Sequence, residues 1–170
     1  MNEIFGVPAH PLFVHIPVVL IPLSLLCTVL MAFVPKLRKS LLIPTAALGA
    51  AGAVGAFFAS EAGEWLQERV PESQLIRDHA QFGEMTRNTA ILFAGALLVW
   101  AVRQLITEHQ RFSNVPFSRL LAPSWVAVAA LSGALLFGSM STYFAVRAGH
   151  TGGKAAWKDR LSPPRPGSEH

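Results

Sequence analysis

LFVHIPVVLIPLSLLCTVLMAFV, residues 12–34, contains no Asp, Glu, Lys or Arg and is long enough to cross the hydrocarbon core of a bilayer as one helix. Residues 41–60 and 120–146 are uncharged in the same way. Residues 88–102 form a shorter apolar run, which reaches spanning length if the Arg103 side chain extends to the interface. The sequence therefore predicts an all-α, polytopic membrane protein, a bundle of four transmembrane helices.

The composition agrees with this class. Hydrophobic residues make up 52% of the chain and charged residues only 14%, whereas soluble domains are roughly a quarter charged. The net charge of +4 comes from basic residues in links and a tail around apolar helices, which favours a membrane protein and argues against a nucleic-acid partner. Cys27 is the single cysteine, so a disulfide within the chain and a C-x-x-C-H haem attachment are both excluded.

The expected helices cover about residues 11–34, 41–60, 80–107 and 120–148. They form a transmembrane domain over residues 1–150, followed by a polar, partly disordered tail at residues 151–170. Residues 1–9 contain no Lys or Arg, so we expect the first apolar run to be a retained helix and not a signal peptide.

An even number of helices places both termini on one side of the membrane, with the link at residues 61–87. Lys36, Arg38 and Lys39 follow the first helix and no basic residue precedes it, so the positive-inside rule places the termini outside the cytoplasm of a bacterial inner membrane. Basic residues near the C-terminus argue for the opposite orientation: Arg147, Lys154, Lys158, Arg160 and Arg165.

Small residues recur along the second expected helix. Gly52, Ala56 and Ser60 are spaced four apart, and Gly49 and Ala53 form a parallel row. Such rows let helix backbones approach closely in lipid. We expect this helix to pack closely against another helix of the bundle; self-association through the same face is the alternative.

Four histidines fall at one expected membrane face. His10 and His15 open the first helix, His79 precedes the third, and His150 closes the fourth, while Glu64 follows the second. Ionisable residues at membrane depth tend to mark functional sites. Five positions separate His10 from His15, so a regular helix turns them to different faces. We predict His15 as a ligand and His10 as a capping or supporting residue.

The segments GVPAHPLFVHIPVVLIPL, DHAQFG and GHTGG resemble a family of predicted bacterial membrane proteins, domain of unknown function 2231. The likeness covers essentially the whole chain, and its most specific part is the pair H-P-L-x-V-H-x-P and G-H-x-G-G. It implies a four-helix membrane domain and no established activity. After GHTGG the chain reads KAAWKDRL, where members commonly continue with a more apolar, aromatic stretch. The resemblance places the family's motif residues at His10, His15, His79, His150, Gly149, Gly152 and Gly153.

Three functions are compatible with this cluster, and we rank haem-linked electron transfer first. A b-type haem would take axial ligands from His15, His79 and His150, with His10 nearby and the backbone at Gly149, Gly152 and Gly153 close to the cofactor. The second is a zinc, copper or non-haem iron site of His15, His79, His150 and Glu64. The third is a non-enzymatic accessory subunit of a larger membrane complex.

No nucleophile or base pattern identifies a reaction, so we expect an electron carrier, a binding protein or an accessory subunit in preference to an enzyme. The expected partner is the lipid bilayer. Other subunits of a membrane redox complex, or further copies of this chain, are the alternatives.

Overall fold

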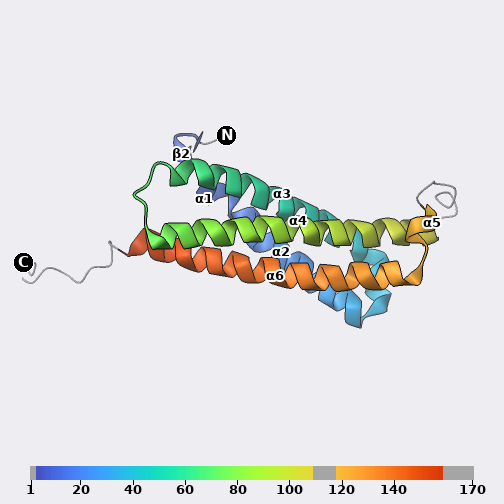
Figure 1. Cartoon of the computed structure of the whole chain (residues 1–170). Helices are drawn as coiled ribbons and strands as arrows, with labels where there is room; N and C mark the ends of the chain where they lie inside the picture. Colours follow the sequence, from blue (N-terminus) through green and yellow to red (C-terminus); the bar gives the residue numbers. More distant parts are fainter. Residues whose placement is uncertain (1–2, 109–117, 159–170) are drawn as a thin grey trace, which may run out of the picture.

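The computed structural model describes residues 3–108 and 118–158 and shows a bundle of four long helices (Figure 1). The long helices are α2 (His15–Phe33), α3 (Arg38–Gln67), α4 (Gln74–Glu108) and α6 (Ser124–Trp157). Five short elements accompany them: β1 (Glu3–Ile4), β2 (Val7–Pro8), α1 (His10–Phe13), the 3-10 helix η1 (Pro35–Leu37) and α5 (Ser118–Leu121). The two strands pair antiparallel as a small hairpin before α1.

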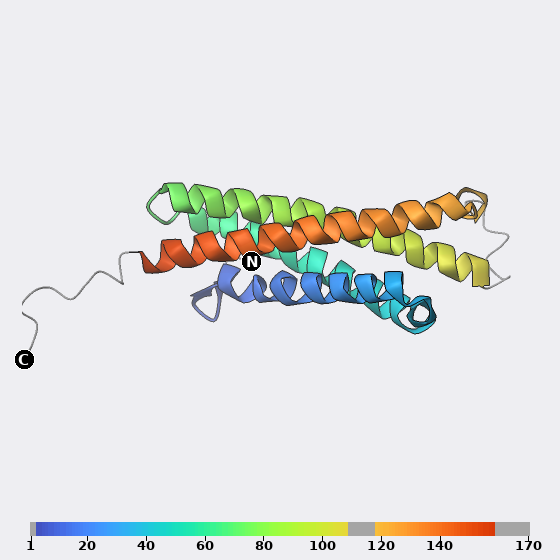
Figure 2. The same ribbon diagram turned by 90° about the horizontal axis from the view of Figure 1, so that it is seen from below.

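Each long helix runs antiparallel to the one before it. Going around the bundle the order is α2, α3, α4, α6, and the most extensive contacts join α4 to α6 and α2 to α3. Figures 1 and 2 show α1, the α3–α4 link and the end of α6 at one end of the bundle, which we call the α1 end. In the described part of the chain, four helical segments are long and apolar enough to cross a membrane, with mean hydropathies from 1.5 to 2.5. This confirms the predicted membrane bundle.

Buried positions on α2 recur with spacings of four and three residues. They are Pro17, Ile21, Ser24, Thr28 and Met31. This spacing gives a narrow seam along the helix, as in bundles whose helices cross at small angles. Large apolar side chains elsewhere on the same helix are exposed on the surface of the bundle, which suits contact with lipid.

Glycines bring the backbone of α3 close to two neighbouring helices. A Cβ added at Gly52 would lie 2.9 Å from Ile21 Cγ1 on α2, and one added at Gly49 would lie 2.8 Å from Leu97 Cδ1 on α4. Neither position has room for a larger residue without movement of its neighbour. The expectation that this helix packs closely within the bundle is confirmed.

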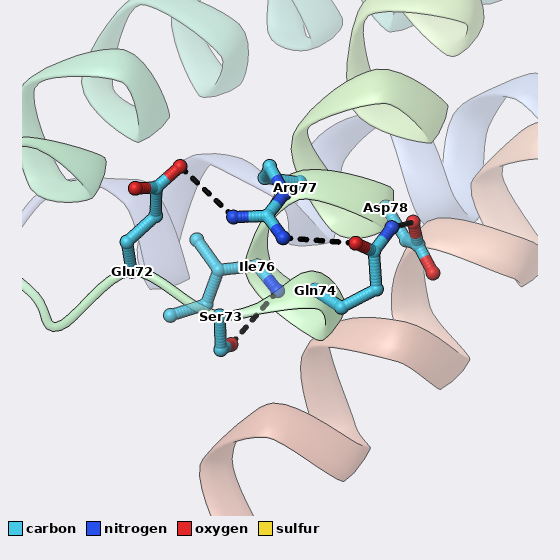
Figure 3. Close-up of polar contacts among 6 residues, drawn as sticks. All are labelled: Glu72, Ser73, Gln74, Ile76, Arg77 and Asp78. Atoms are coloured by element: carbon cyan, nitrogen blue, oxygen red, sulfur yellow. Dashed lines mark hydrogen bonds and ion pairs between the residues drawn. The ribbon is translucent and has the colours of Figure 1, made fainter.

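Several helix ends differ from those expected. The helix α3 continues past residue 60 to Gln67, and α4 begins at Gln74 and not near residue 80. Ser73 explains the early start, because its Oγ accepts a hydrogen bond from the Ile76 N–H at 3.3 Å and so caps the helix (Figure 3). The first expected helix is interrupted at Val14, since Pro17 has no N–H to bond the carbonyl four residues earlier.

The helix α6 also runs further than expected. It continues through Gly149, Gly152 and Gly153 to Trp157, whereas we expected the helix to end near residue 148. One of these glycines packs against a side chain of α4, as described below, and this contact compensates for the low helix propensity of glycine. The rest of the predicted tail, residues 159–170, lies outside the described residues.

Candidate functional site

Two imidazoles meet at the α1 end of the bundle. His10 is the first residue of α1 and His79 lies in the second turn of α4, and both are half-buried. Their Nε2 atoms are 3.4 Å apart, and the two ring planes are nearly perpendicular, with centroids 5.6 Å apart and an interplanar angle of 89°. We call these two residues the histidine pair.

The other ring nitrogen of each histidine is bonded to a backbone carbonyl. His10 Nδ1 lies 2.7 Å from the Ala59 oxygen on α3, and His79 Nδ1 lies 2.8 Å from the Ala148 oxygen on α6. A carbonyl oxygen only accepts hydrogen bonds, so each Nδ1 must carry the proton and donate it. In the neutral imidazoles the two Nε2 atoms are therefore unprotonated, and their lone pairs face one another.

A glycine makes each of these carbonyls accessible. Gly63 comes four residues after Ala59, and Gly152 comes four residues after Ala148. A Cβ at Gly63 would lie 2.9 Å from His10 Nδ1, and a Cβ at Gly152 would lie 2.8 Å from His79 Nδ1. Each imidazole therefore occupies the space that a side chain would otherwise fill on the neighbouring helix.

The two halves of the chain build this site in the same way. Each histidine begins an H-x-x-F sequence, and its Phe stacks on a Phe of the helix that supplies the carbonyl. Phe13 stacks on Phe58 with centroids 5.7 Å apart, and Phe82 stacks on Phe144 at 6.4 Å. The segment from α1 to α3 and the segment from α4 to α6 thus share a repeated motif of H-x-x-F followed by A-x-x-x-G, although the stacked Phe lies one residue before the alanine in α3 and four residues before it in α6.

The structure places His10, and not His15, against a neighbouring helix. His15 is exposed, and its Nδ1 lies 2.7 Å from the Pro11 oxygen within the same turn of chain. His10 instead turns into the bundle, as the five-residue spacing allows. His150 is exposed near the end of α6. Of the four histidines at this end, the structure brings together His10 and His79.

Glu64 has a different partner. Its carboxylate lies 3.6 Å from Arg87 Nη1, and the same guanidinium donates to Ser60 Oγ at 3.1 Å and lies 3.6 Å from Glu84. This network joins α3 to α4. Over residues 3–108 and 118–158, no three His, Cys, Asp or Glu side chains are grouped so as to hold a metal ion. The predicted set of His15, His79, His150 and Glu64 is therefore not assembled.

Glycine and backbone carbonyls are the parts of the site that sequence reasoning missed. The three predicted glycines have different surroundings: Gly152 contacts His79, while Gly149 and Gly153 line an adjacent groove. Gly63 was not singled out. A glycine in a helix interior costs about 1 kcal/mol relative to alanine, so its presence in SEAGEW calls for a packing reason. The repeated pattern of H-x-x-F followed by A-x-x-x-G is the signal that could have found it.

Four apolar helices with a polar site at one end define a multi-pass integral membrane protein. A family model described as predicted membrane protein (DUF2231) matches residues 6–163, and the chain belongs to this family. The resemblance to this family is thereby confirmed. No curated protein and no solved structure matches the chain.

Proposed function

We propose that the histidine pair binds a single transition-metal ion at the edge of the membrane. The observation that carries this proposal is the orientation of His10 and His79, whose Nε2 atoms face each other at 3.4 Å. Histidines that ligate metals commonly donate the other ring N–H to a carbonyl, which fixes the ring and the tautomer. Both members of the pair have this second contact.

The separation of the two nitrogens suits one ion. Two nitrogens bound to a tetrahedral zinc ion at 2.0–2.1 Å lie about 3.3 Å apart. The Nε2 atoms of His10 and His79 are 3.4 Å apart, so their spacing already matches, and each ring would only have to tilt to direct its lone pair at an ion beside the line that joins the two nitrogens. Facing lone pairs also repel each other, and a cation between them, either a proton or a metal ion, removes this repulsion.

Two protein nitrogens leave coordination positions open. Imidazole is a good ligand for zinc, copper and iron, and the remaining positions would be filled by water or by a ligand from outside the chain. A closed structural zinc site has four protein ligands. The proposed function is therefore reversible binding of a metal ion in a membrane protein, with exchangeable ligands.

Haem is the second candidate occupant, and the geometry of the histidine pair fits haem less well than it fits a single metal ion. Two axial imidazoles bonded to one iron at about 2 Å each hold their nitrogens about 4 Å apart, with the macrocycle between the rings. The Nε2 atoms of His10 and His79 are only 3.4 Å apart, so the two rings would have to separate to admit a porphyrin.

Metal titration of the purified protein in lipid nanodiscs tests the proposal. We expect zinc or copper to bind with one-to-one stoichiometry, and His10→Ala or His79→Ala to weaken binding at least about tenfold. His15→Ala and His150→Ala are matched controls, because each removes an exposed imidazole at the same end of the bundle. Equal losses in all four variants would mean that surface histidines bind the metal, and would contradict the proposal.

An absorption spectrum separates the haem candidate from the metal ion. A Soret band that disappears in His79→Ala and persists in His15→Ala would assign the pair to haem. A protein that is colourless after haem supplementation and binds zinc through the pair agrees with the proposed single ion.

Orientation decides which compartment the site faces. The basic residues after the first span favour an outward-facing α1 end in a bacterial inner membrane. A cysteine introduced at exposed Lys158, in a Cys27→Ser background, should react with a membrane-impermeant thiol reagent added outside intact spheroplasts. Labelling only after lysis would place this end in the cytoplasm.

A further inference from the structure

An open groove of about 630 Å³ lies at the α1 end, between the first turn of α4 and the last turns of α6. Leu75 forms its α4 side. We propose that this groove binds the headgroup region of an anionic phospholipid. The α6 side is formed by Gly149, His150, Gly153, Lys154 and Trp157, with Lys158 just beyond the helix end.

Two glycines form the floor of the groove. Gly149 and Gly153 are four residues apart on α6, and a Cβ added to either would meet nothing within 4 Å. Their neighbour Gly152 differs, because it is packed against His79. The groove is therefore open space beside Gly149 and Gly153 on α6, next to the turn whose Gly152 contacts His79.

The groove has positive charge that the described part of the protein does not neutralise. Lys154 and Lys158 are exposed, and neither forms an ion pair within residues 3–108 and 118–158. The carboxylates at the start of α4 have other partners (Figure 3). Glu72 pairs with Arg77 at 3.0 Å, and Asp78 accepts a hydrogen bond from the Gln74 side chain at 2.7 Å.

The position of the groove favours a lipid over a soluble anion. It lies at the end of two membrane-spanning segments, Gln74–Thr107 and Ser124–Trp157, where headgroups meet the protein surface. Leu75 and Trp157 add apolar surface beside the two ammonium groups. A ligand with a phosphate and adjoining acyl chains matches both the charge and the apolar surface.

The residues that line the groove on α6 have no counterparts at the matching positions of α3. Aligning Ala59 and Gly63 with Ala148 and Gly152 places two carboxylates, Glu61 and Glu64, at the positions of His150 and Gly153. The corresponding part of α3 thus carries negative charge where α6 has an imidazole and an open glycine. The groove belongs to one half of the chain, and its proposed role does not depend on metal binding at the pair.

Lipid titration of the full-length protein in detergent, followed by native mass spectrometry, tests the proposal. We expect phosphatidylglycerol to bind more tightly than phosphatidylcholine. The double variant Lys154→Gln/Lys158→Gln should lose about fivefold in phosphatidylglycerol affinity per lysine, and phosphatidylcholine binding should not change. Lys36→Gln/Lys39→Gln is the matched control, since it removes two exposed lysines at the opposite end of the bundle.

A second variant tests the groove itself. Gly153→Leu places a side chain in the groove at a position where the added Cβ meets nothing within 4 Å, and should weaken phosphatidylglycerol binding at least about tenfold while the protein remains folded. Unchanged lipid preference in both variants would overturn the proposal. So would binding of inorganic phosphate alone with the same lysine dependence, because the ligand would then be a soluble anion.

Discussion

Replacing Gly152 by alanine tests the close contact that holds His79 in place. The new Cβ would lie 2.8 Å from His79 Nδ1 and 2.9 Å from Cε1, distances that force the imidazole to move. Movement breaks the 2.8 Å bond from Nδ1 to the Ala148 oxygen. Overpacking of this kind costs typically about 1–3 kcal/mol, whereas alanine gains about 1 kcal/mol over glycine in helix propensity. The net expectation is a loss of up to about 2 kcal/mol.

Gly153→Ala is the matched control for this prediction. It makes the same chemical change one residue away, where the added Cβ meets nothing within 4 Å. We expect it to stabilise the protein by about 1 kcal/mol through helix propensity alone. Thermal unfolding in the same detergent should therefore rank Gly153→Ala above the parent protein and Gly152→Ala at or below it. A Gly152→Ala protein as stable as Gly153→Ala, with unchanged metal affinity, would refute the packing of His79 against α6.

Three further substitutions test the bundle. Phe93→Ala removes a fully buried ring from the core and should lower the free energy of unfolding by about 3 kcal/mol. The control Leu92→Ala, whose side chain is half exposed on the lipid side, should change it by no more than about 0.5 kcal/mol. Similar losses in the two variants would contradict the assigned helix faces. Arg38→Gln removes two hydrogen bonds to carbonyls of α2 and should cost about 2 kcal/mol by chemical unfolding, with exposed Lys39→Gln as a neutral control. Ser73→Ala removes the cap of α4 and should lower the free energy of unfolding by about 1 kcal/mol. Amide hydrogen exchange in the first turn of α4 should also become faster, and unchanged exchange there would argue against the cap.

The fold was predictable because uncharged runs long enough to span a bilayer admit few structures other than helices. The run at residues 41–60 lies entirely within α3, and most of the runs at residues 12–34 and 120–146 lie in α2 and α6. The fourth helix was expected to start near residue 120, whereas α6 begins at Ser124, after a break at residues 122–123. Helix ends were less predictable, because hydropathy marks the lipid-facing part of a helix and gives no sign of a polar extension. The polar first turns of α4 depend on the Ser73 cap, and the last turns of α6 include a glycine packed on His79.

The sequence placed four histidines at one end of the bundle and favoured His15 over His10, whereas in the structure the His10 ring lies inside the bundle and the His15 ring is exposed. Topology alone brings His10, His15, His79 and His150 to one end. It gives no information on which rings point inward, because that depends on the rotation of each helix about its axis. A carbonyl left accessible by glycine decided the rotamer of His10, and such a contact has no hydropathy signal.

X-ray absorption spectroscopy of the zinc-loaded protein tests the histidine pair most directly. For the parent protein in nanodiscs we predict two imidazole nitrogens at about 2.0 Å from one zinc ion. His79→Ala should leave no more than one, and His15→Ala should keep both, because its ring is exposed away from the pair. Two imidazoles retained in His79→Ala, or none in the parent protein, would contradict the assignment of this pair as the metal site.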